Sequence, residues 1–423
     1  MNPLDYLFGL EFHGIKLGLD NITALLKSTG NPQNSYPTVH VGGTNGKGST
    51  VAFLDHILRE AGYRVGRFTS PHLISLNERF MVNGIPIDDS GLEGLIEVFR
   101  SRMDDLDLSP TFFEMNTAIA FQYFVDQEVD IALIEVGLGG RFDSTNVITP
   151  ELSIVTNIDL EHTSFLGDTR AAIAFEKAGI IKEGIPVVFG NLNDEAAPVL
   201  RDAALQRNAR ILEFSRDFDF AIKSTDSLIN YNGPIWQIDD IQLPLVGQHQ
   251  AENASVALAA AELLSTRFTR LTPDCAETGL SSAHWPCRME KVLESPEVTI
   301  DVAHNPAGVR TLINTIDHDV VLLLSVAADK EAASMISILS ERARHIVLTQ
   351  FDNPRATDAS DLAGHVPAHI PSTIEPDFNA AIDAGIRLVR DTGTPLLITG
   401  SLFTAGQARA YLTEQYGAPA MRF

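Results

Sequence analysis

The chain has 423 residues, of which 44% are hydrophobic and 20% charged, and its formal net charge at pH 7 is −24. This length favours two domains over one small core, and the composition argues against a disordered or fibrous chain. The acidic excess would repel a polyanion, so nucleic acid is not an expected partner. Anionic substrates must therefore be bound by local cationic side chains and metal.

The first informative segment is HVGGTNGKGST at residues 40–50, which follows an apolar run and precedes the helix-like VAFLDHILREAG. The glycines allow backbone N–H groups to converge on phosphate oxygens, and the following helix adds the positive end of its dipole. Lys47 supplies a mobile charge, and Ser49 or Thr50 can reach Mg²⁺. The spacing is not the standard one, because Gly48 separates Lys47 from Ser49. We interpret the segment as a phosphate-binding loop, although a flexible turn is the plainer alternative.

Apolar, strand-like runs then alternate with helix-compatible stretches, which predicts a doubly wound, mostly parallel sheet. Residues 216–245 are short, polar and punctuated by Gly and Pro, which predicts antiparallel strands at the end of the first domain. After Trp285-Pro286 a second alternation begins with EVTIDVAHN and ends with TPLLITGS. We therefore expect a nucleotide-binding domain at 1–285 and a smaller Rossmann-like α/β domain at 286–423.

The two cysteines, Cys275 and Cys287, have no metal-ligand spacing and cannot build a disulfide framework. The N-terminal segment lacks a basic region followed by an uninterrupted apolar stretch, and no run is long enough to span a membrane. These features predict a cytoplasmic protein that has no membrane partner.

Several further motifs point to one family when they are taken together. They are FTSPHLISLNERFMVNG (68–84), EVGLGGRFDSTNV (135–147), IDLEHTSFLG (158–167), FEKAGIIK (175–182), LPLVGQHQAENASVALAA (243–260), WPCRME (285–290), DVAHNP (301–306) and TGSLFTAGQAR (399–409). With the phosphate loop, this set resembles the folylpolyglutamate synthase and dihydrofolate synthase branch of the Mur ligases, from about Gly14 to the C-terminal region. The resemblance implies ATP-dependent amide formation, in which a folate or dihydropteroate carboxylate becomes an acyl phosphate and the amino group of L-glutamate displaces the phosphate.

The resemblance also implies a set of metal ligands. Ser70, Glu135 and His162 each follow a strand-like run, so their hydroxyl, carboxylate and imidazole can face the crevice beyond the sheet and bind Mg²⁺. In the family, Lys177 is carbamylated by CO₂, which converts a cation into a metal-binding carboxylate. We place Lys177 at the start of a helix. Two alternatives remain open. His162 could be an ordinary cap or loop histidine, and Lys177 could be a solvated helix lysine.

For the nucleotide, the family match points to the phosphate loop, to Asn253 for adenine and ribose, and to Arg288 and Asp301. The loop residues are Gly43, Thr44, Asn45, Gly46, Lys47, Gly48, Ser49 and Thr50. Asn253 as a helix N-terminal cap is the alternative. Cys287 stands where the family commonly has a glycine ahead of the arginine, and a Cβ there restricts positive φ. The resemblance assigns the catalytic roles to Lys47, Lys177, His162 and Arg288.

For the substrates, the match places His72 and Arg79 on the folate side, and His304 and Ser401 on the side of the incoming glutamate. Arg79 could instead pair with an acidic surface neighbour, and Asn305-Pro306 could mark a simple turn. The active site is expected between the domains, and domain closure would then shield the acyl phosphate from water. The oligomeric state expected from the family is a monomer.

Two other functions remain open. Another Mur-type amide ligase is a close alternative, although a UDP-binding domain would need more chain ahead of the phosphate loop than about forty residues. A regulatory nucleotide-binding protein would explain the loop but not Lys177, Asp301, His304 or a full second domain.

Overall fold

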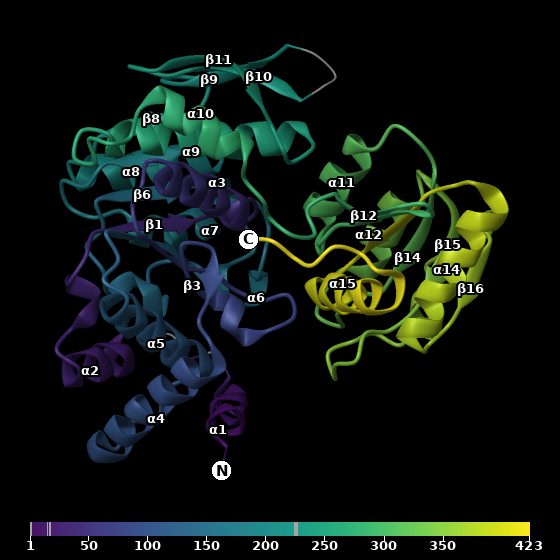
Figure 1. The fold of residues 1–423 in the computed structure, drawn as a ribbon, viewed down its shortest axis with the longest axis horizontal. Helices are drawn as coiled ribbons and strands as arrows, with labels where there is room; N and C mark the ends of the chain where they lie inside the picture. Colours follow the sequence, from purple (N-terminus) through teal and green to yellow (C-terminus); the bar gives the residue numbers. More distant parts are fainter. Residues whose placement is uncertain (1, 15, 17, 224–226) are drawn as a thin grey trace. The chain divides into compact units, whose positions relative to one another are not determined.

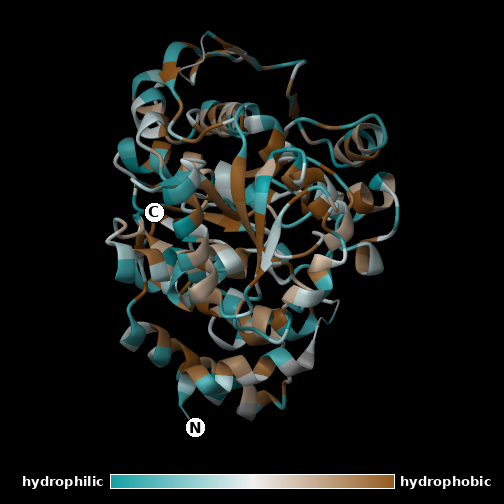
Figure 2. Cartoon of the chain, turned by 90° about the vertical axis from the view of Figure 1, so that its right-hand side faces the viewer, coloured by the Kyte–Doolittle hydropathy of each residue, from teal (hydrophilic) through white to brown (hydrophobic). Residues whose placement is uncertain are grey.

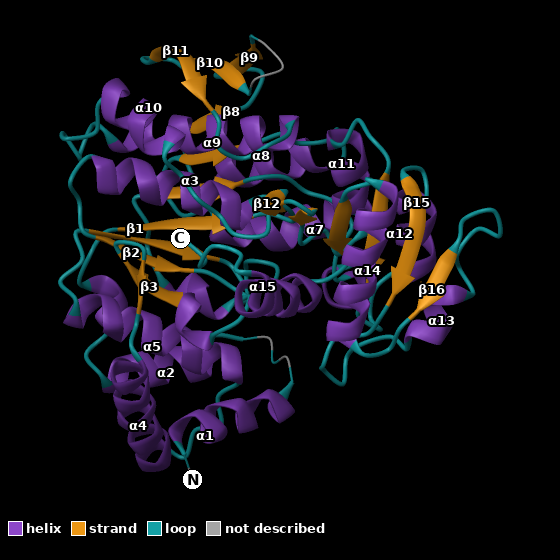
Figure 3. Cartoon of the chain, turned by 45° about the vertical axis from the view of Figure 1, so that its right-hand side comes forward, coloured by secondary structure: helices purple, strands orange, loops and turns teal. Residues whose placement is uncertain are grey.

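The computed structural model describes residues 2–14, 16, 18–223 and 227–423. The described residues divide into two compact units. Unit 1 comprises Met1–Pro244, His249–His284 and Phe423, and unit 2 comprises Leu245–Gln248 and Trp285–Arg422. Each unit is an α/β structure whose strands and helices are distinguished by colour in Figure 3.

The main sheet of unit 1 has the strand order β4-β3-β2-β5-β1-β6-β7-β8 (Figure 1). Its strands are β1 (Thr38–Gly42), β2 (Val65–Phe68), β3 (Phe80–Val82), β4 (Ile85–Pro86), β5 (Ile131–Glu135), β6 (Leu152–Val155), β7 (Val187–Phe189) and β8 (Ile211–Glu213). The pairings from β2 through β8 are parallel, whereas β3 pairs antiparallel with β2 and with β4. The predicted mostly parallel, doubly wound sheet is therefore confirmed.

Strand β1 lies between β5 and β6, at the point where the strand order reverses. In register, Val41 is opposite Glu135 and Gly42 is opposite Val155, so the segments that follow β1, β5 and β6 leave the sheet at one edge. In open α/β sheets, ligands bind beyond the carboxyl ends of the strands, at the point where the strand order reverses. All five residues of β1 and of β5 are buried, as expected of strands covered on both faces.

Helices cover both faces of this sheet. On one face α3 packs against β1, β2 and β5 and also against α10, while on the other face α5 packs against β2 and β3 and against α2 and α4. The helices of the unit are α1 (Pro3–Gly9), α2 (Asp20–Ser28), α3 (Lys47–Glu60), α4 (Asp89–Leu106), α5 (Phe112–Asp126), α6 (Thr163–Leu166), α7 (Arg170–Lys177), α8 (Ala196–Gln206), α9 (Gln248–Leu264) and α10 (Pro273–Ser281). Figure 2 shows hydrophobic colouring along the strands and hydrophilic colouring on many outer helix turns.

The antiparallel strands expected within residues 216–245 form a small separate sheet in the order β11-β10-β9. They are β9 (Asp219–Ile222), β10 (Leu228–Asn232) and β11 (Gln237–Gln242), and residues 224–226 of the predicted segment lie outside the described part. This sheet is fixed to α9 by Glu262, which accepts a hydrogen bond from the Tyr231 hydroxyl at 3.0 Å.

Unit 2 contains a sheet with the order β12-β13-β17-β14-β15-β16, in which β12 pairs antiparallel with β13 and the other pairings are parallel. Its strands are β12 (Glu290–Glu294), β13 (Glu297–Ile300), β14 (Val320–Leu324), β15 (Ala343–Leu348), β16 (Ser372–Ile374) and β17 (Leu396–Thr399). Its helices are α11 (Pro306–Thr315), α12 (Ala332–Leu339), α13 (Ala359–Ala363), α14 (Phe378–Thr392) and α15 (Leu402–Tyr416). None of the helices described in either unit is long and apolar enough to cross a membrane.

Candidate active site

The phosphate-binding loop joins β1 to α3 and depends on two glycines with positive φ. Gly43 has φ 137° and Gly46, the residue that caps α3, has φ 82°. At these angles a side chain would be strained, and a Cβ on Gly46 would lie 2.3 Å from the Asn253 Oδ1 atom. The two glycines therefore give the loop its shape and allow Asn253 to approach it closely.

The segment after β6 holds the loop from one side. The Thr44 amide donates to the Asn157 carbonyl oxygen and the Asn45 amide to Asn157 Oδ1, both at 2.9 Å. The Thr44 hydroxyl donates to the Asp159 carbonyl oxygen at 3.2 Å and accepts from the Asp159 amide at 3.0 Å. These bonds fix the phosphate loop and residues 156–159 to each other.

Lys47 begins α3 and folds back over the loop. Its ammonium donates to the carbonyl oxygens of Gly43 and Thr44, each at 3.1 Å. Ser49 and Thr50 lie in the first turn of α3 with Gly48 and are buried, and among the described residues the Thr50 hydroxyl has no hydrogen-bond partner. An unpaired buried hydroxyl next to a phosphate loop suits a metal or phosphate ligand.

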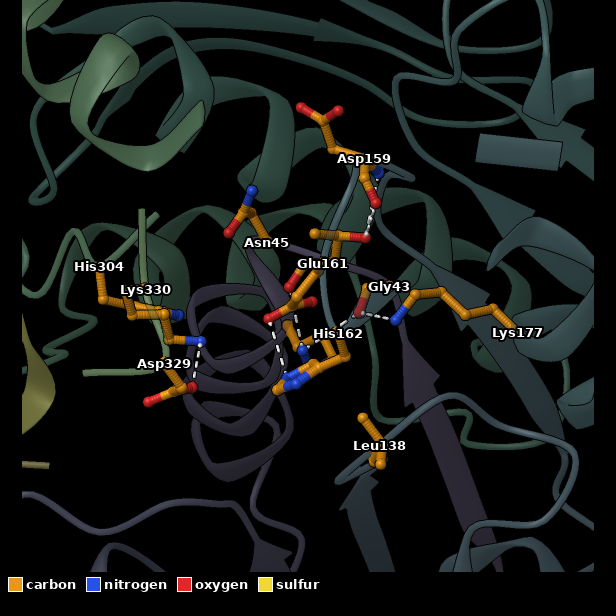
Figure 4. Close-up of polar contacts among 12 residues, drawn as sticks. Gly43, Asn45, Leu138, Asp159, Glu161, His162, Lys177, His304, Asp329 and Lys330 are labelled. Carbon is orange, nitrogen blue, oxygen red and sulfur yellow. Dashed lines mark hydrogen bonds and ion pairs between the residues drawn. The ribbon is translucent and has the colours of Figure 1, made fainter. Parts of the chain in front are cut away.

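Lys177 reaches the same loop from a different element. It is the last residue of α7, because Thr169 caps that helix and a 3₁₀ turn follows at Ala178–Ile180, so the prediction that Lys177 starts a helix is wrong. Its ammonium donates to the Gly43 carbonyl oxygen at 2.7 Å (Figure 4), and the side chain is buried. Burial and then the charge of Lys47 lower the pKa of Lys177 to about 7, against the opposing charges of Glu161 and Asp143. A solvated helix lysine is therefore excluded.

Glu161 and His162 lie beside this lysine. His162 occupies the cap position of α6 with φ 49°, but its side chain makes no capping bond, and its Nε2 atom lies 3.5 Å from Glu161 Oε1. Figure 4 draws the two side chains toward each other below Asn45 and Asp159. Glu161, whose charge raises the pKa of Lys177, was missed by the sequence analysis although it lies within the IDLEHTSFLG motif.

Ser70 and Glu135 meet at the ends of neighbouring strands β2 and β5. The Ser70 amide donates to Glu135 Oε2 at 3.2 Å, and Glu135 is only 5% exposed. The segment after Glu135 is held by Asp143, which accepts the Leu138 amide at 2.7 Å. Glu135 is a buried carboxylate, and Ser70, whose amide binds it, carries a hydroxyl. Both side chains offer oxygen ligands of the kind that Mg²⁺ prefers.

His72 and Arg79 also come together. Arg79 Nε donates to His72 Nδ1 at 3.0 Å, and the guanidinium lies 5.2 Å from the centroid of the Phe112 ring. Arg79 is 7% exposed, so the alternative of a surface ion pair is wrong. Burial and the neighbouring Arg79 lower the pKa of His72 to about 4, which keeps its imidazole neutral near pH 7. This pair of a buried cation and a partly buried, neutral imidazole can orient an anionic or aromatic substrate.

Asn253 lies inside α9 rather than at its N-terminus, so the capping alternative is wrong. It is 8% exposed, its Nδ2 donates to Gln250 Oε1 at 3.3 Å, and its amide packs against Gly46. This position beside the phosphate loop suits a contact with a nucleotide bound there.

In unit 2 the turn that carries Arg288 is bound to Asp301. The Asp301 carboxylate accepts the amides of Met289 at 3.0 Å and of Ala303 at 2.8 Å. Its oxygens therefore already shape the backbone around Arg288, a role that the sequence analysis did not assign to Asp301.

His304, Ser401 and Lys330 follow the adjacent strands β13, β17 and β14. His304 Nδ1 lies 3.0 Å from the Val302 carbonyl oxygen, and Ser401 caps α15 by accepting the Phe403 amide at 3.1 Å. Lys330 lies 3.5 Å from Asp329, whose carboxylate also binds Arg355 at 2.9 Å (Figure 4). Lys330 was missed by the sequence analysis.

The sequence matches two protein-family descriptions. Residues 41–261 match the Mur ligase middle domain, and residues 287–402 match the Mur ligase glutamate ligase domain. The chain is 39% identical over 422 residues to a dihydrofolate synthase/folylpolyglutamate synthase of Bacillus subtilis, which covers 96% of this chain and 97% of that protein. The chain belongs to the Mur ligase family, in its folylpolyglutamate and dihydrofolate synthase branch.

Other relatives of this Mur ligase agree. A folylpolyglutamate synthase of Lacticaseibacillus casei is 37% identical over 404 residues, which are 92% of this chain and 93% of that protein. The structure of Mycobacterium tuberculosis folylpolyglutamate synthase complexed with ADP superposes with a TM-score of 0.89 at 33% identity, covering 97% of this chain and 98% of that one. A folylpolyglutamate synthase complex with AMPPCP and folate gives a TM-score of 0.84 at 34% identity, with 97% and 100% of the two chains covered.

Proposed function

We propose that this protein is an ATP-dependent ligase that joins L-glutamate to the carboxylate of a folate or of dihydropteroate. The observation that carries the proposal is the position of Lys177, a buried amine with a lowered pKa, on the carbonyl of Gly43 in the phosphate loop. A regulatory nucleotide-binding protein does not need this lysine. Relatives named as folylpolyglutamate or dihydrofolate synthases support the same substrates.

The proposed chemistry begins with the acceptor carboxylate, which is a poor electrophile. One of its oxygens attacks the γ-phosphorus of ATP, ADP leaves, and the acyl phosphate now has a good leaving group. Mg²⁺ would be held by Ser70, Glu135, His162 and a carbamylated Lys177, and when bound it neutralises the phosphate charge. Lys47 and the loop amides orient the phosphates, Asn253 binds the adenosine, and His72 and Arg79 hold the acceptor.

In the second step the amino group of glutamate attacks the acyl carbon and phosphate leaves. Glutamate carries two carboxylates, and His304 and Ser401 supply no permanent positive charge for them. We propose that Lys330 provides that charge, because it follows β14, which lies next to β17 and one strand away from β13. Arg288 and Asp301 are proposed to serve the nucleotide.

The proposal is tested by incubating the purified protein with ATP, Mg²⁺ and labelled glutamate, with dihydropteroate in one sample and tetrahydrofolate in another. Products are resolved by mass. Glutamate added in both samples means a bifunctional synthase, and addition in one sample assigns the acceptor. ATP binding without glutamate addition in either sample would contradict the proposal and favour another Mur-type amide ligase or a regulatory protein.

We further propose that the protein acts on small molecules as a monomer in the cytoplasm. The free thiols of Cys275 and Cys287 support a reducing compartment. Light scattering coupled to size exclusion measures the mass of the particle directly, and a dimer mass would contradict the proposed monomer.

A further inference from the structure

The turn that presents Arg288 is strained on both sides. Cys287 has φ 56° and Met289 has φ 48°, so two residues with a Cβ occupy the left-handed region on either side of one arginine. This region is unfavourable for residues other than glycine, and such backbone conformations persist only where the surroundings enforce them. Something in unit 2 must therefore hold this turn.

Two carboxylates bind the strained residues. The Cys287 amide donates to Glu290 Oε2 at 2.9 Å, and the Met289 amide donates to Asp301 Oδ2 at 3.0 Å. The Cys287 carbonyl oxygen accepts the Val302 amide at 3.1 Å, so both backbone groups of Cys287 are bound. Cys287 is fully buried, which leaves its side chain little freedom to relax the turn.

Glu290 is itself fixed by a buried cation. Arg409, on α15, donates from Nε to Glu290 Oε1 at 3.1 Å, and its second nitrogen lies 3.0 Å from the same oxygen. The Arg409 side chain is 2% exposed and also donates to the Thr413 hydroxyl at 2.7 Å. One oxygen of Glu290 therefore binds the helix that begins after Ser401, and the other binds the turn before Arg288.

We propose that Glu290 is a positioning residue, which with Arg409 behind it holds Cys287 in the left-handed conformation and so directs Arg288. This inference rests on the proposed function, in which Arg288 serves the phosphates of ATP. It predicts that loss of Glu290 impairs the enzyme through Arg288. Because a glycine adopts positive φ without strain, the need for Glu290 arises from the Cβ of Cys287.

The experiment compares kcat and KM for ATP in glutamate addition to the better acceptor. The variants are Arg288→Ala, Glu290→Ala, the double variant Arg288→Ala/Glu290→Ala, Cys287→Gly, and Cys287→Gly/Glu290→Ala. Glu294→Ala is the matched control, because Glu294 lies on the same strand β12 and its side chain is 84% exposed. Thermal unfolding of each variant separates loss of stability from loss of turnover.

The expected result is that Glu290→Ala lowers kcat/KM for ATP in the same way as Arg288→Ala, by about tenfold to a hundredfold, as misplacement of a catalytic group does. The double variant should be no worse than Arg288→Ala, and Cys287→Gly should restore most of the activity to Glu290→Ala. If Glu290→Ala does not fold, kcat/KM for ATP is instead compared between Arg288→Ala and the two variants Cys287→Gly/Glu290→Ala and Glu290→Gln.

Additive losses in the double variant, or failure of Cys287→Gly to restore turnover while the protein stays folded, would overturn the inference. An Arg288→Ala variant with unchanged kcat/KM for ATP would also overturn the inference, because Glu290 would then have no functional arginine to position. None of these outcomes contradicts the proposed ligase function. That function is contradicted only if the unaltered protein adds no glutamate to either acceptor.

Discussion

The Lys177 ammonium and the Gly43 carbonyl oxygen are 2.7 Å apart, although 134 residues separate them in the chain. This hydrogen bond joins the end of α7 to the first residue of the phosphate loop. Lys47 donates to the same carbonyl at 3.1 Å, so two amines share one oxygen. The burial of Lys177, and then its repulsion by the charge of Lys47, lower its pKa and explain why its amine can be neutral near physiological pH.

The first prediction concerns the pH dependence of ligation. Carbamylation needs the neutral amine and CO₂, and with a pKa of about 7 the neutral fraction of Lys177 falls as the pH drops through 7. We expect activity to decrease below about pH 7 and to respond to added bicarbonate. Lys177→Ala should be impaired and partly restored by acetate or another short carboxylate, as measured by product formation from pH 5.5 to 9. Activity near that of the unaltered protein in Lys177→Ala would contradict the carbamate.

The second prediction concerns stability. Because the pKa of Lys177 in the folded protein lies below its ordinary value of 10.5, the unfolded chain binds the proton more tightly. The buried, protonated Lys177 therefore destabilises the folded protein by its full amount below pH 7. This destabilisation decreases as the pH rises above 7 and is lost above 10.5. Lys177→Met should therefore raise the melting temperature at pH 6.5, with a gain that shrinks toward pH 10. Thermal denaturation in a CO₂-free buffer measures this, and a gain that is independent of pH would contradict it.

The third prediction is that Lys47→Ala lowers kcat for ligation by about 10²- to 10³-fold, the usual cost of losing one group that stabilises transferring charge. The substitution also removes two bonds to loop carbonyls, so ATP affinity should fall as well. Turnover and ATP binding by calorimetry give the two effects separately. Lys223→Ala, which alters an exposed lysine paired with Asp240 on the small antiparallel sheet, should leave both unchanged.

The fourth prediction separates strain from collision at Gly46. In Gly46→Ala the new methyl group meets Asn253 Oδ1, and we expect KM for ATP to rise about tenfold or more, which corresponds to ~1.4 kcal/mol. Gly184 has φ 69° and open space where its Cβ would lie, so Gly184→Ala carries strain without collision. The control should lose ~1–2 kcal/mol of stability and keep its KM for ATP. Equal KM values in the two variants would show that the approach of Asn253 is unimportant.

The fifth prediction assigns a charge to the glutamate site. Lys330→Met should raise KM for glutamate by about tenfold to a hundredfold, since hydrogen bonds to charged groups contribute ~1.5–3 kcal/mol, and should leave KM for ATP unchanged. Lys291→Met removes a lysine of the same unit that is paired with Glu294 and Glu297, and it should change neither constant. The ratio of kcat/KM for glutamate to kcat/KM for glutamine should decrease in Lys330→Met and stay unchanged in Lys291→Met. An unchanged KM for glutamate would exclude this role.

The parallel strands and the phosphate loop could be predicted from the sequence because their signals are local. An apolar run that ends in GGTNGKGS specifies strand, turn and helix within about fifteen residues. The β3–β4 hairpin also had a local signal in Asn83-Gly84, both with positive φ, although the sequence analysis predicted no hairpin there.

The rest depends on contacts between distant residues, which periodicity cannot reveal. No local pattern shows that Glu161 acts on Lys177 or that Asp301 holds the Met289 amide. The strain at Cys287 was the exception. A Cβ where the family commonly has a glycine indicated a restricted turn, and the structure gives that residue φ 56°.

The reciprocal bonds between Thr44 and Asp159 also have a consequence for protein engineering. A phosphate loop of this kind cannot be transplanted as a short cassette of residues 42–50, because the segment after β6 supplies the partners that hold its backbone in shape. A functional graft would need residues 156–162 as well, and with them the strand spacing that sets β1 next to β6. Recombination between related ligases should therefore tolerate crossovers outside this pair of segments and fail when a crossover brings together a loop and a partner segment from different parents.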